Sequence, residues 1–246
     1  MVNLIPLLTV LVPVLNPIDV ALEAADTPIS LRAAFEVELV SDTGRRVFAY
    51  DPRRPVEESW QVIAAEGEDG YLDEVAANWG AEPAPDGRLL PDDLRASFGH
   101  DVEIDKFEHA WRIGFEHTPS DNDGPFDLWV GSRVDATAWL SPQSGQFLRI
   151  DYHLPKPVRG PEGGRILTYD QSYFLEPDPV YGLSMITAFS LSFSARAAFT
   201  TIRQNYAMRV LKLEVFSQRP RMKLLFCKHV PKGALAGLRE SNKLPP

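Results

Sequence analysis

The chain has 246 residues, of which 44% are hydrophobic and 10% aromatic, so it can bury a sizeable core and is not a disordered chain. Its formal net charge of −9 excludes a protein that coats nucleic acid, because phosphate binding requires clustered Lys and Arg. The single cysteine, Cys227, excludes an intrachain disulfide and a Cys-x-x-Cys metal or redox pair. We expect one globular domain with no nucleic-acid partner.

The amino terminus predicts export. Residues 2–15 are almost wholly apolar, too few to span a bilayer but typical of a secretory signal peptide. Cleavage is expected near Ala24 or Ala25, which assigns residues 1–25 to the signal and the protein to the periplasm. Asn16 and Pro17 also fit the cap and first residue of a short helix. The alternative is a cytoplasmic protein whose terminal segment joins the core.

From Ala33 onward the hydrophobic period becomes two, which predicts a half-buried strand. Phe35, Val37 and Leu39 alternate there with glutamates. A turn at 41–44 returns the chain into 46–50 as a hairpin, and a third strand begins at Ser59.

Residues 67–99 differ from their flanks and predict a helical insertion rather than a separate domain. The first helix is indicated by apolar residues at helical spacing, namely Tyr71, Leu72, Val75 and Trp79. A second short helix is predicted from Pro91 to Phe98, with proline at a favoured first position.

Strands are predicted for the rest of the chain as far as residue 216. In the first of them we expect one face to be buried, made of Phe107, His109, Trp111, Ile113 and Phe115. The opposite face, made of Glu108, Arg112 and Glu116, should meet solvent. Further strands are predicted at 126–130, 134–140, 147–154, 166–175, 185–199 and 202–216. The fold class is therefore mainly β (α+β): residues 26–216 form a curved antiparallel sheet or half-barrel of about nine or ten strands.

The carboxyl-terminal segment, residues 217–246, is basic, with seven Lys or Arg against one Glu. It is either a solvated terminus or a tail that contacts a membrane surface or a protein partner.

No catalytic constellation is visible. Asp170, Glu176 and Asp178 lie close together but among prolines, which indicates a turn. The acidic stretch after His100 lacks the spacing of a calcium loop. No Gly-x-Ser-x-Gly elbow, phosphate-binding loop or dinucleotide fingerprint is present. We therefore expect no catalytic residue, no metal and no cofactor.

Large aromatic side chains are abundant, with five Trp and thirteen Phe. Two arrangements can accommodate them: the sheet curls and fills itself, or it leaves an apolar cavity. The helical insertion favours a cavity, over which it would act as a lid or plug. The residues expected to line it are Phe35, Val37, Trp60, Trp111, Phe115 and Trp139. Trp139 lies on one face of its strand, and the opposite face could be the buried one instead. That face is made of Val134, Ala136, Ala138 and Leu140.

The order of these segments resembles a known family. The hairpin is followed by Tyr50-Asp51-Pro52-Arg53-Arg54-Pro55, then Trp60-Gln61-Val62-Ile63, the helical insertion and a long meander containing Pro155-Lys156-Pro157. Over residues 33–216 this succession is similar to divergent members of the periplasmic lipoprotein-carrier (LolA-like) superfamily. The resemblance implies a half-barrel whose concave apolar face is covered by helices and receives acyl chains or lipidated peptides. The family's long amino-terminal helix is short or missing in this chain.

The sequence thus predicts a non-catalytic periplasmic binding protein for an apolar ligand, such as a lipid or the acyl chain of a lipoprotein. A lipid or lipidated protein is the expected partner. The alternative is a sensory or regulatory domain that uses the same half-barrel to bind a protein, and a hydrolase is the third option.

Overall fold

The computed structural model describes residues 16–91, 97–98, 102–118, 125–160, 164–197 and 200–218. The strands are β1 Leu31–Ser41, β2 Gly44–Tyr50, β3 Trp60–Gly67, β4 Val102–Lys106, β5 Trp111–Phe115, β6 Asp135–Leu140, β7 Phe147–His153, β8 Val158–Arg159, β9 Arg165–Pro177, β10 Ser184–Ala197 and β11 Thr200–Ser217. The helices are α1 Pro17–Ala25, α2 Val56–Ser59, α3 Gly70–Gly80, the 3₁₀ helix η1 Pro85–Leu89 and α5 Pro125–Gly131.

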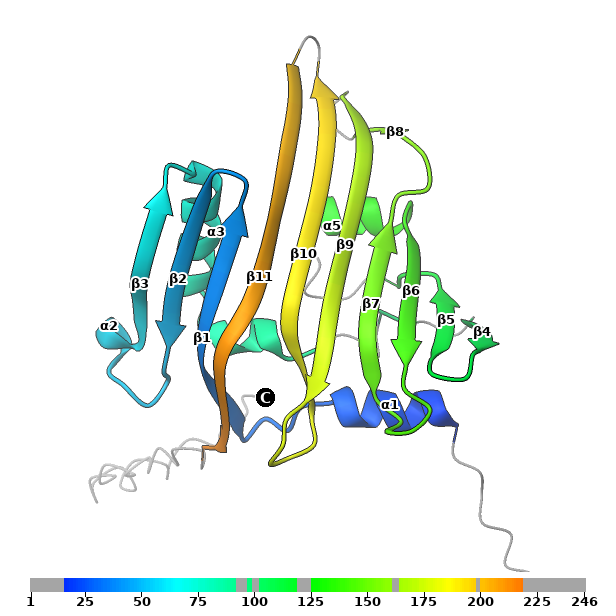
Figure 1. Cartoon of the computed structure of the whole chain (residues 1–246), viewed down its shortest axis with the longest axis horizontal. Helices are drawn as coiled ribbons and strands as arrows, with labels where there is room; N and C mark the ends of the chain where they lie inside the picture. The colour runs from blue at the N-terminus through cyan, green and yellow to red at the C-terminus, as the bar shows by residue number, and fades with distance from the viewer. Residues whose placement is uncertain are drawn as a thin grey trace, which may run out of the picture.

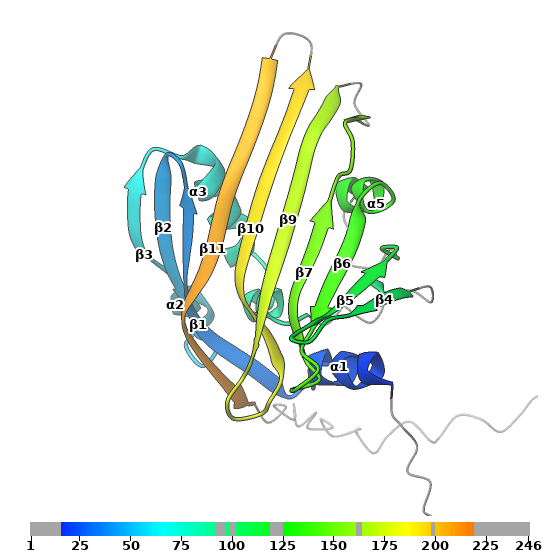
Figure 2. The same cartoon turned by 45° about the vertical axis from the view of Figure 1, so that its right-hand side comes forward.

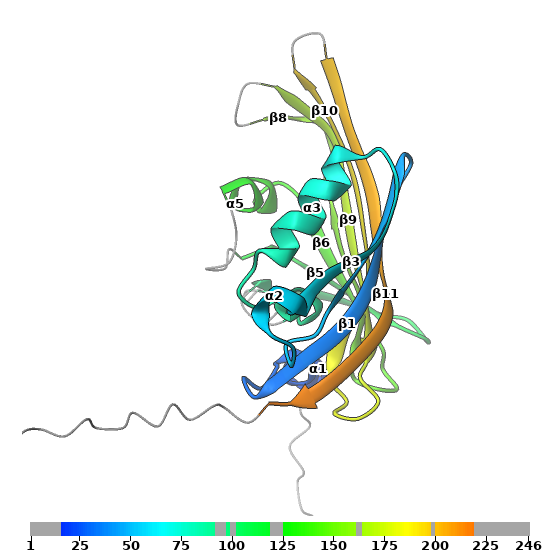
Figure 3. The same cartoon turned by 90° about the vertical axis from the view of Figure 1, so that its left-hand side faces the viewer.

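All strands join one open antiparallel sheet in the order β3-β2-β1-β11-β10-β9-β7-β6-β5-β4, with β8 paired to β9. The sheet is strongly curved, and β9, β10 and β11 project beyond the other strands (Figures 1 and 2). The helices α3 and α5 lie on the same side of the sheet (Figure 3), and α1 lies at the opposite end from the projecting strands (Figure 1). The predicted mainly β fold with a helical insertion is confirmed, and the sheet has eleven strands.

The alternation of apolar and charged residues in β1 buries one face of the strand, as predicted. Its inward residues, Leu31, Ala33, Phe35, Val37 and Leu39, are all buried. On the other face Glu36 and Glu38 accept hydrogen bonds from the basic side chains of Lys212 and Arg209 on β11, at 2.6 and 2.8 Å. The outer face of the sheet is therefore polar and largely ion-paired here, while the inner face builds the core.

One predicted strand is wrong and another is wrong in part. Residues 126–130 form most of the helix α5, because a short apolar run without alternation does not by itself distinguish a strand from a helix. The predicted strand through Phe107 is interrupted by a hairpin turn, in which the amide of Phe107 donates to the carbonyl of Ala110 at 3.1 Å. Phe107 and His109 are exposed in this turn, whereas Ile113 and Phe115 on β5 are buried as expected.

The core has a main cluster between the inner face of the sheet and the helices, and a smaller one beneath α5. Within the described residues, no helix is both long enough and apolar enough to cross a membrane. Several predictions fall outside the described residues: the apolar run 2–15, most of the second insertion helix, the segment around His100, Cys227 and the tail from residue 219 onward.

Candidate ligand-binding cavity

A cavity of about 740 Å³ lies on the inner side of the sheet, between its central strands and the elements α3, η1 and α5. This volume is within the range of small-molecule sites. Its apolar walls include Leu39, Val75, Trp79, Leu90, Val130, Val134, Ile150, Ile186, Phe189 and Met208. Its polar lining includes Glu82, Arg88, His117, Tyr152, Tyr169, Gln171, Tyr173 and Tyr206. The cavity is therefore amphipathic.

A polar row runs along the floor of the cavity on β9. Tyr169, Gln171 and Tyr173 are two residues apart, so the pleat of the strand turns all three side chains to the inner face. The Tyr169 hydroxyl donates to the Gln171 carbonyl, and the Gln171 amide donates to the Tyr173 hydroxyl, both at 2.5 Å. This row places hydrogen-bonding groups in the middle of the floor.

Aromatic rings continue the floor across neighbouring strands. Tyr173 lies 5.0 Å from Phe189 on β10, and Phe189 lies 5.4 Å from Tyr206 on β11, measured between ring centroids. Tyr206 contacts Tyr71 of α3 edge-on at 5.6 Å. Burial raises the pKa of both Tyr206 and Tyr71, so these phenols stay neutral and able to donate hydrogen bonds at physiological pH.

Charged and titratable side chains lie at the walls. Arg88 of η1 pairs with Glu82 at 2.5 Å and its guanidinium lies 5.5 Å from the ring centre of Trp79. His117 contacts Tyr152 edge-on at 5.6 Å and packs over Gly131, where an added Cβ would lie 2.6 Å from the imidazole. Because the charged pair is internally neutralised, the cavity shows no strong preference for an ion of either sign.

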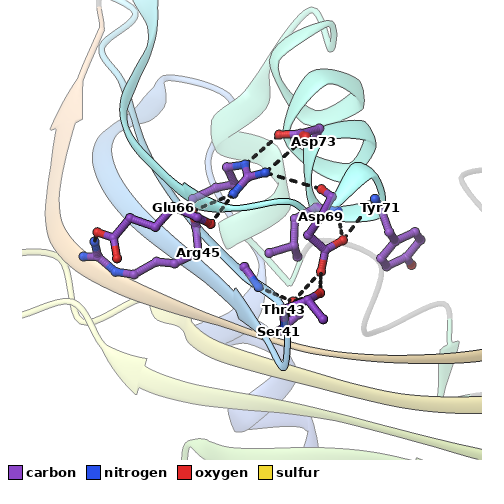
Figure 4. A network of polar contacts seen from close by, with 10 residues as sticks. Ser41, Thr43, Arg45, Glu66, Asp69, Tyr71 and Asp73 are labelled. Carbon is purple, nitrogen blue, oxygen red and sulfur yellow. Dashed lines mark hydrogen bonds and ion pairs between the residues drawn. The ribbon is translucent and has the colours of Figure 1, made fainter.

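The helix α3 is fixed to the sheet at its amino-terminal end, as Figure 4 shows. Asp69 caps the helix by accepting from the amides of Tyr71 and Leu72, each at 3.1 Å. The same carboxylate accepts from Thr43, at 2.6 Å, and from Ser41 in the turn between β1 and β2. These hydrogen bonds hold the pKa of Asp69 at about 2, below its ordinary value.

A buried arginine reinforces this attachment. Arg46 of β2 donates to both carboxylate oxygens of Asp73 in α3, at 2.6 and 3.1 Å, and to the carbonyl of Glu66 at 2.7 Å. Asp73 and Glu66 are labelled in Figure 4. The hairpin of β1 and β2, the end of β3 and the start of α3 are therefore joined by one polar network.

The other end of the insertion is held by Asp86 of η1, which is 1% exposed. Its carboxylate accepts from Arg32 of β1 at 2.6 and 2.7 Å and from the amide of Ala33 at 2.9 Å. Close by, the indole of Trp79 donates to the carbonyl of Pro85 at 2.7 Å. The described part of the insertion is thus attached to the sheet at both ends and forms a fixed wall of the cavity.

Three of the predicted lining residues belong to the packed core beside the cavity. Phe35 and Trp60 join a cluster with Phe48 and Trp79, in which Phe48 and Trp60 are 4.4 Å apart between ring centroids. Val37 is completely buried on the same face. Side chains fill this part of the interior. Of the two arrangements that the sequence left open, a filled sheet and an apolar cavity, the filled sheet therefore applies here.

The other three predicted residues do not line the cavity either. Phe115 stacks on Phe98 at 4.1 Å, and Trp111 lies under the ammonium group of Lys106. Trp139 is on the outer face of β6, where its indole donates to Asp151 at 3.0 Å, because Ala136, Ala138 and Leu140 form the buried set. None of the six predicted residues is among the described residues that line the cavity.

The residues missed by the sequence analysis are the polar ones of the floor, Tyr152, Tyr169, Gln171 and Tyr173. A signal existed on β9, where Tyr, Gln and Tyr recur at a spacing of two. A search directed at apolar side chains passes over this pattern, because tyrosine combines a large ring with a polar tip.

The carboxylates first considered for chemistry have structural partners. Asp178 accepts from the amides of Val180 and Tyr181 in the turn after β9, and Asp170 pairs with His153 on the outer face. Among the described residues, no group of three or more His, Cys, Asp or Glu side chains could hold a metal ion.

Comparison with known proteins gives little. No family model and no curated protein matches the sequence. One solved structure, a domain from Vibrio parahaemolyticus described as an outer membrane lipoprotein-sorting protein domain, aligns with a TM-score of 0.36 and 9% identity. The alignment covers 80% of this chain and 90% of that chain. A likeness of this size shows neither a shared family nor a shared function.

Proposed function

We propose that this protein is a non-catalytic carrier that holds one amphipathic lipid, or the acyl chain of a lipidated protein, in the cavity between the sheet and α3. The observation that carries the proposal is the cavity of about 740 Å³ with apolar walls and a row of hydrogen-bonding side chains along its floor. The proposed location is the periplasm, in keeping with the apolar amino-terminal run.

The two kinds of lining suit the two parts of such a ligand. Each methylene of an alkyl chain that leaves water for the apolar walls gains about 0.8 kcal/mol. An ester, amide or hydroxyl group of the ligand can replace or share the hydrogen bonds among Tyr169, Gln171 and Tyr173. The apolar walls and the polar floor together therefore suit an amphipathic molecule.

The proposal is tested with a fluorescent fatty acid and a variant that fills the cavity. Val75 is a half-buried residue of α3 that faces the cavity, and Val75→Phe adds a ring to its wall. The matched control is Val62→Phe on the edge strand β3, where Val62 is 59% exposed and does not line the cavity. We expect Val75→Phe to weaken uptake at least about tenfold and the control to bind like the wild type, since the added ring displaces bound methylenes.

A second measurement uses the protein as it is purified. Native mass spectrometry followed by organic extraction should recover a bound lipid or lipopeptide. Equal uptake by both valine variants, together with extraction of no lipid, would contradict the carrier function.

A further inference from the structure

Four arginines gather at the projecting end of the sheet, and we call them the distal arginine patch: Arg159, Arg165, Arg196 and Arg203. They lie on β8, β9, β10 and β11, the last three of which extend beyond the other strands in Figure 1. Arg165 stands directly opposite Arg159 on one side and Arg196 on the other. All four side chains are exposed.

The patch faces away from the cavity. Ala195 packs into the inner cluster beneath α5, so its neighbour Arg196 points to the outer face. One step further down the same face, the hydroxyls of Thr168 and Ser194 are 2.7 Å apart, and Ser194 is the register partner of Arg203. The surface around the patch is therefore polar as well as cationic.

Within the described residues, the patch differs from neighbouring parts of the outer face in having no acidic partner. Elsewhere Arg149 pairs with Asp151, Arg209 with Glu38 and Lys212 with Glu36, at distances of 2.6 to 2.8 Å. No ion pair is formed by any of the four patch arginines with the described part of the chain. Like charges directly opposite each other in a sheet destabilise it, so we expect this row to cost stability.

We infer that the distal arginine patch docks the protein onto an anionic phospholipid bilayer. A guanidinium group binds phosphate oxygens in a bidentate manner, which a row of unpaired arginines at an extended end can do on a flat surface. The net charge of −9 includes these four arginines, so the rest of the chain carries −9 − 4 = −13, which repels such a surface and favours an orientation with this end toward it.

The choice of a lipid surface as the partner rests on the proposed function. A carrier collects its ligand from a membrane or delivers it there. The strands that carry three of the patch arginines, β9, β10 and β11, also form much of the floor of the cavity, so docking at their distal ends would hold the cavity-bearing strands at the bilayer surface.

The test is sedimentation of the full-length protein with vesicles of phosphatidylglycerol and phosphatidylcholine, compared with vesicles of phosphatidylcholine alone. The variant is Arg165→Gln/Arg196→Gln. Each arginine near an anionic surface contributes about 1 kcal/mol, so the partition coefficient should fall about 30-fold. The matched control is Arg112→Gln/Arg149→Gln, which removes the same charge from two acid-paired arginines of the outer face. The basic tail is retained in every variant.

Support requires that the wild type bind the anionic vesicles in a salt-sensitive manner, that the control bind within about twofold of it, and that the patch variant lose binding. An equal loss in both variants, or no binding by the wild type, would overturn the inference. Binding of the patch to an acidic protein but not to vesicles would overturn it as well. Fatty-acid uptake separates the two proposals: its failure with intact vesicle binding contradicts the carrier function alone.

Discussion

Asp86 offers the sharpest test of how the cavity wall is held. Its buried carboxylate accepts three hydrogen bonds, two from the Arg32 guanidinium and one from the amide of Ala33, which is completely buried. Asp86→Ala removes all three. It leaves the amide of Ala33 without its acceptor, at a cost of about 1 to 3 kcal/mol. The guanidinium is 26% exposed and regains part of its hydration, so the total loss should stay near the lower limit for a broken buried pair, about 3 kcal/mol.

Urea unfolding followed by circular dichroism measures this loss as a lower midpoint at an unchanged slope. The control is Asp105→Ala, which breaks the exposed pair with Arg112 and should cost under about 1 kcal/mol. Since Asp86 fixes η1 at the cavity, Asp86→Ala should also weaken fatty-acid uptake. Equal destabilisation by the two variants would refute the view that Asp86 anchors the insertion.

Three further predictions concern single contacts. The pKa of Asp69, about 2 in the folded protein against an ordinary 3.8, means that its carboxylate stabilises the fold above about pH 4 and that this contribution is lost as the pH falls toward 2. Asp69→Asn should therefore flatten the acid limb of the stability–pH curve measured by urea unfolding. Arg165→Gln/Arg196→Gln should raise the free energy of unfolding by about 0.5 kcal/mol, by removing opposed like charges, and a decrease would argue for a structural role. Gly80→Ala places a Cβ 2.6 Å from the indole of Trp60. This clash should lower the thermal midpoint, with a loss of about 1 to 2 kcal/mol in the free energy of unfolding.

The sequence predicted most reliably the elements whose periodicity is carried by one buried face. β1 alternates apolar and charged residues, and α3 repeats Leu72, Ala76 and Trp79 along one side, so each pattern admits a single orientation. α5 was mistaken for a strand because its short apolar run has no alternation. Its helical form is evident only in the folded structure, where Val130 of α5 is buried in the smaller core cluster.

The cavity could not be located from the sequence because it depends on which strands become neighbours. The size of an aromatic side chain does not indicate the face of the sheet on which it lies. On β6 the small side chains of Ala136 and Ala138 occupy the crowded inner face, while the indole N–H of Trp139 donates its hydrogen bond to Asp151 on the outer face. The floor is assembled from β7, β9, β10 and β11, whose pairing sets Tyr152 beside Gln171. No local pattern encodes that neighbourhood.

The burial of helix α1 bears on where the signal peptide is cleaved. Residues 1–25 were expected to be a signal peptide, a prediction that no observation here tests, and Ile18, Ala21, Leu22 and Ala25 are buried in the main core. Cleavage after Ala25 would remove all four, and burial of the leucine and isoleucine alone is worth about 3 to 6 kcal/mol.

We therefore expect the mature protein to retain α1, with its first residue at or before Asn16, as intact mass measurement of the native protein will show. In that protein Leu22→Ala should lower the free energy of unfolding by about 2 to 3 kcal/mol, whereas Val20→Ala, at a residue 36% exposed on the same helix, should cost under about 0.5 kcal/mol. A mature chain that begins at Asp26 would contradict this expectation and return α1 to the signal peptide. The core contacts of the helix would then belong to the precursor alone.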